Sequence, residues 1–179
     1  MRLHFTRKNI TTIFSFLAPM LFIQSTLLAQ TRMDNHINLK DSVKGITIHQ
    51  ETNFNVSAQR LYETLLSSKE FSNCTKKSFA GFTAMSANID SAVGGAFSLF
   101  DGHIIGRILE LVPNQRIVEA WRVVDWPVGV YSIAKFEFKP IRSGTQLIFD
   151  HVGFPEGLKK HLSIGWQKHY WDALAKYFQ

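Results

Sequence analysis

The chain has 179 residues, of which 45% are hydrophobic and 13% aromatic. This length and composition predict one globular domain with its own core and exclude a disordered protein. The formal net charge is +6, and without the three basic residues before position 9 the remainder carries 17 bases and 14 acids, a net charge of +3. Because these bases are scattered, we expect no nucleic-acid partner. The single cysteine, Cys74, excludes an internal disulfide, and no Cys or His pair has zinc-site spacing, so no metal or other cofactor is expected.

The first 29 residues have the pattern of a secretory signal peptide. Three positive charges within residues 2–8 precede a mostly apolar run over 10–28, and a cleavage site is predicted after Ala29. We therefore expect an exported protein, periplasmic or secreted. An uncleaved segment would instead give the chain its only contact with a membrane, and a true start at Met33 would place the protein in the cytoplasm. Residues 30–44 are polar and predict a linker.

The folded domain is expected over 45–179. Alternating apolar residues predict a first strand over 46–54. Ser57 is a favourable N-cap, and the residues after it predict a short helix over 58–66. A second short helix is expected over 68–74, with Ser68 as its cap.

From Phe79 to Val152 the pattern changes to short alternating segments separated by turn residues. The pair Asp101-Gly102 predicts a tight hairpin, and turns this short join antiparallel neighbours. The expected strands are 82–88, 96–100, 103–112, 116–124, 131–139 and 145–152.

The last segment, Ser163 to Phe178, predicts an aromatic amphipathic helix. Residues three or four positions apart form two adjoining apolar stripes, which are Trp166, Tyr170, Ala173 and Tyr177, and Trp171, Leu174 and Phe178. Lys168, Asp172 and Lys176 mark the solvent side. Such a helix needs a broad apolar surface, so we predict an α+β fold in which a curved antiparallel sheet of about seven strands surrounds a long C-terminal helix. Two short helices follow the first strand.

Several motifs, in order, resemble the C-terminal domain of the activators of the Hsp90 ATPase. They are Val93–Gly102, Glu110–Pro113, Ile117–Arg122, Asp125–Pro127, Gly144–Thr145 and Gly165–Trp171. The resemblance covers roughly Gly45 to Phe178 and implies the START-like, helix-grip fold, also called Bet v 1-like or SRPBCC. Eukaryotic members have a separate N-terminal domain that contacts the chaperone, for which this chain has no room. An exported protein would not meet a cytosolic chaperone, so an Hsp90-type partner is not expected.

The resemblance and the aromatic content favour a cavity between sheet and helix that binds a hydrophobic small molecule or a lipid-like ligand. A filled core is the alternative. An enzyme like a polyketide cyclase or aromatase would use the same cavity, and a chaperone-interacting protein is a third possibility. The apolar residues expected in the cavity are Phe97, Leu99, Leu109, Trp121, Phe136, Phe138, Phe149, Trp166 and Tyr170. Arg107 and His151 are the polar candidates, and either would serve as the acid if the protein is an enzyme.

Other polar residues have structural alternatives. Arg107 and Glu119 lie in mid-strand, where they would pair across strands or line the cavity. Arg122 is a candidate for a cation–π contact with the neighbouring Trp121, and structural pairing is the favoured alternative. Gly165 is expected to let the helix approach the sheet closely. Beyond His151, the histidines of the domain are expected at the surface, because a metal or acid–base role would need an orienting carboxylate.

Overall fold

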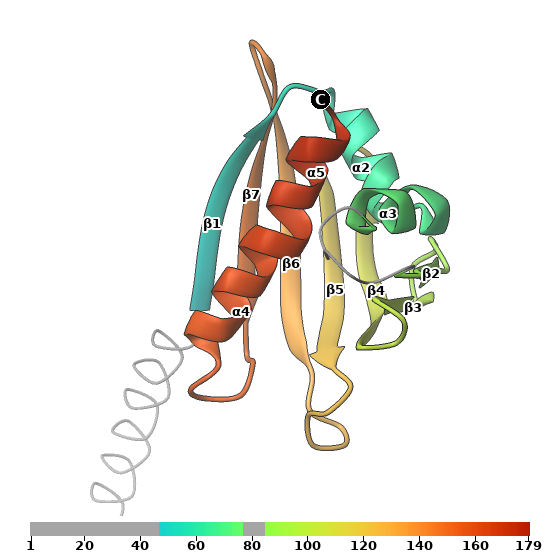
Figure 1. Cartoon of the computed structure of the whole chain (residues 1–179), viewed down its shortest axis with the longest axis vertical. Coiled ribbons are helices and arrows are strands. Elements are labelled where there is room, and N and C mark those ends of the chain that lie inside the picture. Colours follow the sequence, from blue (N-terminus) through green and yellow to red (C-terminus); the bar gives the residue numbers. More distant parts are fainter. Residues whose placement is uncertain (1–46, 77–84) are drawn as a thin grey trace, which may run out of the picture. The chain divides into compact units, whose positions relative to one another are not determined.

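The computed structural model describes residues 47–76 and 85–179 (Figure 1). The predicted signal peptide, linker and alternative start at Met33 lie outside the described residues. Everything described belongs to one unit, Val43–Gln179. Within the described ranges, every helix is too short or too polar to span a bilayer.

The described part contains one antiparallel sheet of seven strands in the spatial order β1-β7-β6-β5-β4-β3-β2. Consecutive strands from β2 to β7 are neighbours, as their short turns require. β1 pairs with β7, with Thr47 opposite Val152, so the first and last strands lie side by side. The strands are β1 (Thr47–Phe54), β2 (Asn88–Ile89), β3 (Ala96–Leu99), β4 (Ile104–Val112), β5 (Arg116–Val123), β6 (Ser132–Ile141) and β7 (Gly144–Val152). The predicted α+β class and antiparallel sheet are confirmed.

The prediction of a strand over 82–88 is wrong for most of its described residues, 85–88. In this region only Asn88–Ile89 pairs with the sheet. The side chain of Asp101 accepts hydrogen bonds from the backbone N–H and the hydroxyl of Ser86, at 2.8 and 2.7 Å. The hydroxyl of Ser68 accepts another from the N–H of Ile89, at 2.8 Å. This segment is therefore held by side chains instead of by a longer strand ladder.

The hairpin between β3 and β4 turns one residue earlier than the Asp101-Gly102 pair predicts. Phe100 and Asp101 both have left-handed backbone angles, with φ of 52° and 55°, and the N–H of Gly102 donates to the carbonyl of Leu99 at 3.2 Å. A bulky residue seldom adopts this conformation. Here it turns the ring of Phe100 into the core, where its centroid lies 5.4 Å from that of Tyr170.

Two short helices follow β1, as predicted. The first, α2 (Ala58–Leu66), begins after Ser57, whose hydroxyl accepts a hydrogen bond from the N–H of Arg60 at 3.2 Å. The second, α3 (Ser68–Thr75), is capped by Ser67, one residue before the predicted cap.

The C-terminal helix consists of α4 (Lys159–Trp166), a π-helical turn η1 (Gln167–Trp171) and α5 (Asp172–Tyr177). It lies across one face of the sheet (Figure 1). The wider π turn points two consecutive aromatic residues inward, since Tyr170 and Trp171 are both buried. The sequence predicted one regular helix and did not indicate this turn.

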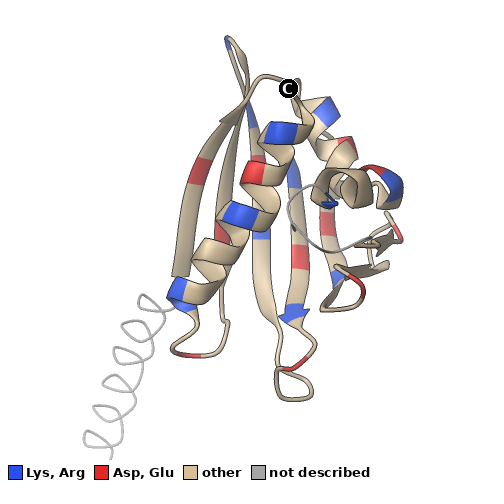
Figure 2. Ribbon diagram, viewed as in Figure 1, with Lys and Arg blue, Asp and Glu red and all other residues tan. Residues whose placement is uncertain are grey.

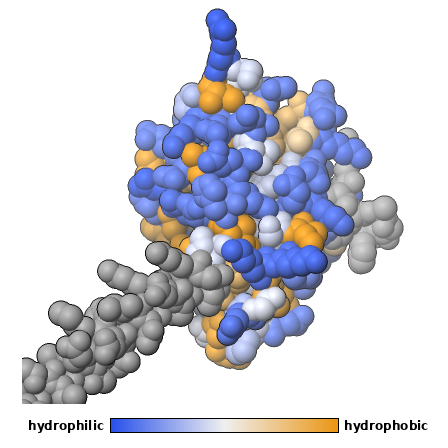
Figure 3. All heavy atoms as spheres, turned by 90° about the vertical axis from the view of Figure 1, so that its left-hand side faces the viewer, coloured by the Kyte–Doolittle hydropathy of each residue, from blue (hydrophilic) through white to orange (hydrophobic). Residues whose placement is uncertain are grey.

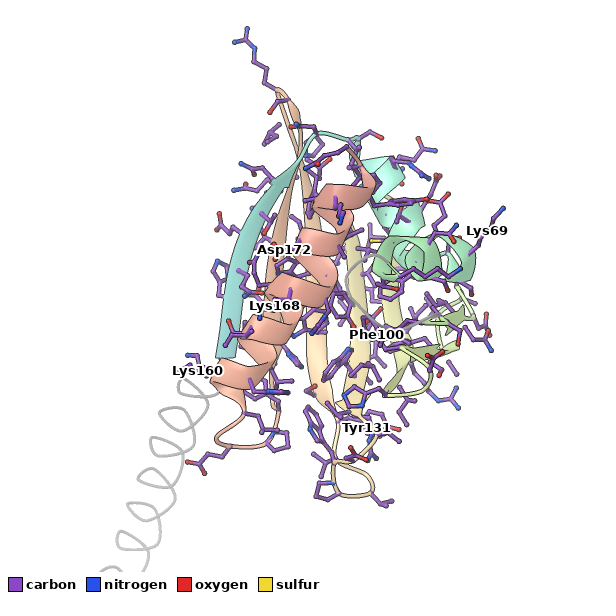
Figure 4. All side chains as sticks on the ribbon, in the orientation of Figure 1. Lys69, Phe100, Tyr131, Lys160, Lys168 and Asp172 are labelled. Atoms are coloured by element: carbon purple, nitrogen blue, oxygen red, sulfur yellow. The ribbon has the colours of Figure 1, made fainter. Side chains whose placement is uncertain are left out.

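The solvent side of the C-terminal helix carries Lys168, Asp172 and Lys176, as predicted. Figure 4 shows the labelled Lys168 and Asp172 on the side turned away from the sheet. An acidic band lies between basic bands along this side (Figure 2). The face of the molecule drawn in Figure 3 is mostly hydrophilic with small hydrophobic spots. This mixture is typical of a solvated helix face.

The core between helix and sheet is largely aromatic. The ring of Phe149 on β7 lies 4.3 Å from Trp166 and 5.1 Å from Trp171, centroid to centroid. Each such aromatic pair contributes about 0.5–1.5 kcal/mol beyond the burial of its surface. The helix is therefore held on the sheet by packing between aromatic rings of the two elements.

Candidate functional site

A pocket of about 350 Å³ lies between the first half of the C-terminal helix and strands β4 and β5. We call it the outer pocket. Its volume falls at the lower end of the range for small-molecule sites. Most of its wall is apolar, formed by Met85, Phe100, Ile104, Trp121, Val123, Leu162, Ile164, Gly165, Trp166 and Tyr170. The fold therefore leaves space for a small guest.

Four basic side chains line the same pocket, and we call them the basic rim: His103, His161, Lys168 and His169. His103 follows the β3–β4 turn, and the other three lie on the C-terminal helix. The pKa of His169 is lowered, first by burial and then by the positive charges of Lys168, His103 and His161. The other three groups thus lie within electrostatic reach of His169. Within the described ranges, no group of three or more His, Cys, Asp or Glu side chains is placed to hold a metal ion.

A second, inner pocket of about 10 Å³ has room for roughly one water molecule. Tyr170 lines both pockets, and Glu119 on β5 borders only the inner one. Burial raises the pKa of Glu119 to about 8, so the carboxyl group is mostly protonated at neutral pH. In the described part of the chain it has no salt bridge and no hydrogen bond.

Two buried polar atoms beside this carboxyl group, Nε1 of Trp121 and the hydroxyl of Tyr170, have no hydrogen-bond partner among the described residues. Burial raises the pKa of Tyr170. The charge of Glu119 raises the pKa of Tyr170 further. The indole N–H of Trp121 is near enough to lower that pKa, but it does not reach hydrogen-bond geometry. Unpartnered buried polar groups are rare, and they mark places where a water molecule or a ligand completes the bonding.

His151 has a structural role. Its Nδ1 accepts a hydrogen bond from Nε1 of Trp166 at 2.9 Å, and its Nε2 lies 2.6 Å from the hydroxyl of Ser132. That hydroxyl donates to the carbonyl of Trp121 at 2.8 Å, so the neutral His151 carries its proton on Nε2. Burial lowers the pKa of His151 to about 3. Both ring nitrogens are occupied and neither pocket is lined by this residue, so it is not placed to act as an acid.

Two predicted cavity residues point away from the interior. Leu109 is 46% exposed, because a bulge between Ile108 and Glu110 leaves it without a partner on β5. Arg107 is exposed and donates to the carbonyl of Gly94 at 2.8 Å. The prediction that these two residues lie in the cavity is wrong.

The other predicted residues lie in the interior. Trp121 and Trp166 line the outer pocket, Tyr170 lines both, and Phe97, Leu99 and Phe136 line the inner one. Phe138 and Phe149 lie in the core without bordering either pocket. The sequence analysis missed two lining residues, Val123 and Phe100. Alternation along β5 from Trp121 would have indicated Val123. The inward position of Phe100 depends on the unusual turn between β3 and β4.

Three further expectations are corrected. Arg107 and Glu119 do not pair, because Arg107 lies opposite Ala120 and faces solvent. Arg122 stacks on Tyr131, at 5.5 Å, instead of on Trp121. Gly165 does not mediate close packing, since a side chain there would meet no atom within 4 Å and would project beside the outer pocket.

Curated relatives are similar to this chain over part of their length. The mouse activator of 90 kDa heat shock protein ATPase homolog 2 is 27% identical over 129 residues, covering 72% of this chain and 37% of the relative. The human activator of 90 kDa heat shock protein ATPase homolog 1 is 30% identical over 104 residues, covering 58% and 31%. The match thus spans about a third of these relatives.

Solved structures share the fold. An Hsp90 activator from Plasmodium falciparum superposes with a TM-score of 0.64 at 24% identity, covering 71% of this chain and 91% of that one. The Aha1 dimer from Colwellia psychrerythraea gives 0.58 at 16% identity, covering 74% and 96%. At these identities the likeness concerns the fold alone, and it confirms the predicted START-like architecture.

The family model described as activator of Hsp90 ATPase homolog 1-like protein matches residues 55–179. That match includes α2, α3, the C-terminal helix and every strand except β1. It also includes all residues that line the two pockets. The chain therefore belongs to the family of activator of Hsp90 ATPase homolog 1-like proteins.

Proposed function

We propose that this protein binds a hydrophobic small molecule or lipid-like ligand in the outer pocket. The observation that carries the proposal is an open pocket of about 350 Å³ with aromatic walls at the edge of the core. Protein interiors are normally packed to crystal density, and the apolar wall of this open pocket lacks the side-chain contacts that the rest of the core has. An apolar guest would restore those contacts.

The polar groups at the deep end support the same proposal. Tyr170 borders the pocket, and its hydroxyl and the indole N–H of Trp121 are unpartnered within the described residues. Ligand sites typically combine apolar walls with a few polar groups that fix the orientation of the guest. A ligand atom that accepts a hydrogen bond would satisfy the indole N–H.

The test uses a neutral apolar dye, N-phenyl-1-naphthylamine, whose fluorescence rises in apolar surroundings. We expect saturable uptake of one dye per chain, and native mass spectrometry of the purified protein tests separately for a co-purified guest. Absence of saturable uptake, together with a bare native mass, would contradict the proposal.

A reaction of the polyketide cyclase or aromatase kind is a second candidate, favoured by one observation. Glu119 is a half-buried acid with a pKa raised to about 8, and it borders the inner pocket together with Tyr170, which also lines the outer pocket. A carboxyl group that holds its proton near neutral pH is suited to donate it to a developing oxyanion. Turnover of a linear poly-ketone by the wild type, lost in Glu119→Gln, would support this candidate, and equal turnover by both would contradict it.

A third candidate is the activity in the names of the curated relatives, activation of a heat shock protein ATPase. The match covers about a third of those relatives, so this activity needs a direct test: the rate of ATP hydrolysis by a purified Hsp90 with and without the protein.

We also propose export through the N-terminal segment. A mature protein that begins at Gln30 would support export, whereas one that begins at Met33 would support a cytoplasmic location and the chaperone candidate.

A further inference from the structure

We propose that the ligand carries one uncharged hydrogen-bond acceptor, such as a ketone or amide oxygen, which binds to the indole N–H of Trp121 and the hydroxyl of Tyr170. This inference rests on the proposed function and specifies the class of ligand. An apolar wall alone accepts a guest in any orientation, whereas these two polar groups would fix which end of the guest enters first.

The two polar groups come from different elements of the fold. Trp121 lies on β5 and Tyr170 in the π turn η1, and both line the outer pocket. Trp166 packs against both, with its ring centroid 5.4 Å from that of Trp121 and 4.1 Å from that of Tyr170. The indole N–H is near enough to lower the pKa of Tyr170, so one oxygen atom beside the two groups would accept from both.

The indole of Trp121 differs from its neighbours in the core. Trp166 donates its N–H to His151 at 2.9 Å. Trp171 donates its N–H to Gln50 at 2.8 Å. The N–H of Trp121 has no acceptor among the described residues, and an indole N–H can only donate. Because buried donors are normally satisfied, the partner that completes this wall must bring an acceptor.

The π turn places Tyr170 at the same wall. Such turns are rare and occur frequently at functional sites. This one points Tyr170 and Trp171 inward together, and Tyr170 then lines both pockets. Its hydroxyl also has no partner among residues 47–76 and 85–179. A carbonyl oxygen has two lone pairs, so it would accept from the hydroxyl and from the indole N–H of Trp121 at once.

The surroundings of Tyr170 favour an uncharged acceptor. Within the described chain, the inner pocket is lined by apolar residues, Tyr170 and Glu119, and by no basic residue. Burial raises the pKa of Glu119 to about 8, so this carboxyl group is mostly neutral at pH 7. Lys168 lines the outer pocket but lies on the side of the helix turned away from the sheet (Figure 4). An anion held against Trp121 and Tyr170 would therefore lose its hydration without a lysine or arginine beside it.

The experiment compares 2-acetylnaphthalene with 2-ethylnaphthalene as competitors of the neutral dye. The two probes have nearly the same shape, and the first has a carbonyl group where the second has a methylene group. Tyr170→Phe should weaken binding of the ketone about two- to tenfold, the range for one neutral hydrogen bond, and should leave binding of the hydrocarbon unchanged. The hydroxyl has no partner to lose, so the variant should remain folded.

The matched control is Tyr62→Phe, which removes the hydroxyl of a buried tyrosine that borders neither pocket. It should alter the affinity of neither probe. If the dye and the hydrocarbon bind but Tyr170→Phe leaves the ratio of the two probe affinities unchanged, the inference on the acceptor is overturned and the proposed function stands. If neither the dye nor either probe binds the wild type, the proposed function fails and the inference fails with it.

Discussion

The indole N–H of Trp166 donates a hydrogen bond to Nδ1 of His151, at 2.9 Å, inside the core. This bond joins the C-terminal helix to β7. A second hydrogen bond, between His151 and Ser132, connects β7 to β6. A buried network of this kind specifies a unique packing only when each member is satisfied, as here. The position of the helix, and hence the shape of the outer pocket, depends on it.

Replacing His151 with Ala should lower the free energy of unfolding by about 3 kcal/mol. The change removes a fully buried side chain and leaves the indole N–H of Trp166 without its acceptor. Urea denaturation measures the effect, and the exposed His161→Ala is the matched control, with a change within about 0.5 kcal/mol. Equal losses in the two variants would show that the network does not hold the helix.

The same histidine predicts a dependence on pH. Burial lowers the pKa of His151 to about 3 from a usual value of 6.5, so the unfolded state binds the proton first. Its contribution to stability is complete above pH 6.5 and is lost progressively as the pH falls towards 3. Between pH 7 and pH 5 the wild type should lose about 2 kcal/mol more than His151→Ala. Parallel losses in both proteins would contradict a neutral, buried His151.

Glu119 predicts the opposite dependence. Burial raises its pKa to about 8 from 4.5, so the unfolded state releases the proton first and stability is lost as the pH rises through this range. Glu119→Gln keeps the shape and removes the titration. The variant should gain about 3.5 kcal/mol relative to the wild type between pH 5 and pH 8, measured by urea denaturation. A constant difference between the two proteins would mean that Glu119 is ionised in the folded state.

The bulge in β4 predicts unequal effects for two adjacent aliphatic residues. Ile108 is fully buried, whereas Leu109 is 46% exposed. Ile108→Ala should therefore cost about 3 kcal/mol of unfolding free energy, and Leu109→Ala less than about 1 kcal/mol. A larger loss at Leu109 than at Ile108 would place the bulge elsewhere.

The sequence predicted the order of elements and the two faces of the strand over 131–139, because alternation and turn residues act locally. The inward side of 131–139 follows from Ala134, Phe136 and Phe138, all of which are buried. Local patterns do not indicate the π turn at Gln167–Trp171 or the bulge beside Leu109. Both depend on how distant residues pack, and each changes which side chain points inward.

The candidate site was less predictable than the fold. Trp121, Trp166 and Tyr170 were expected in a cavity and border the outer pocket. His151 was misjudged, because residue type does not reveal that both its nitrogens are bonded within the core. The basic rim combines a turn residue with three helix residues, so only the folded chain brings its charges together.

The most direct test of a ligand-binding pocket fills it from within the helix. Gly165→Leu adds a side chain where the structure has open space beside the outer pocket, and it replaces glycine in a helix, so stability should be kept or raised by up to about 1 kcal/mol. Gln167→Leu adds the same side chain to an exposed position of the same helix as the control. Titration of the neutral dye into the three proteins is the measurement. We expect saturable binding by the wild type and by Gln167→Leu and its loss in a stable Gly165→Leu; equal binding by all three would contradict a ligand site in the outer pocket.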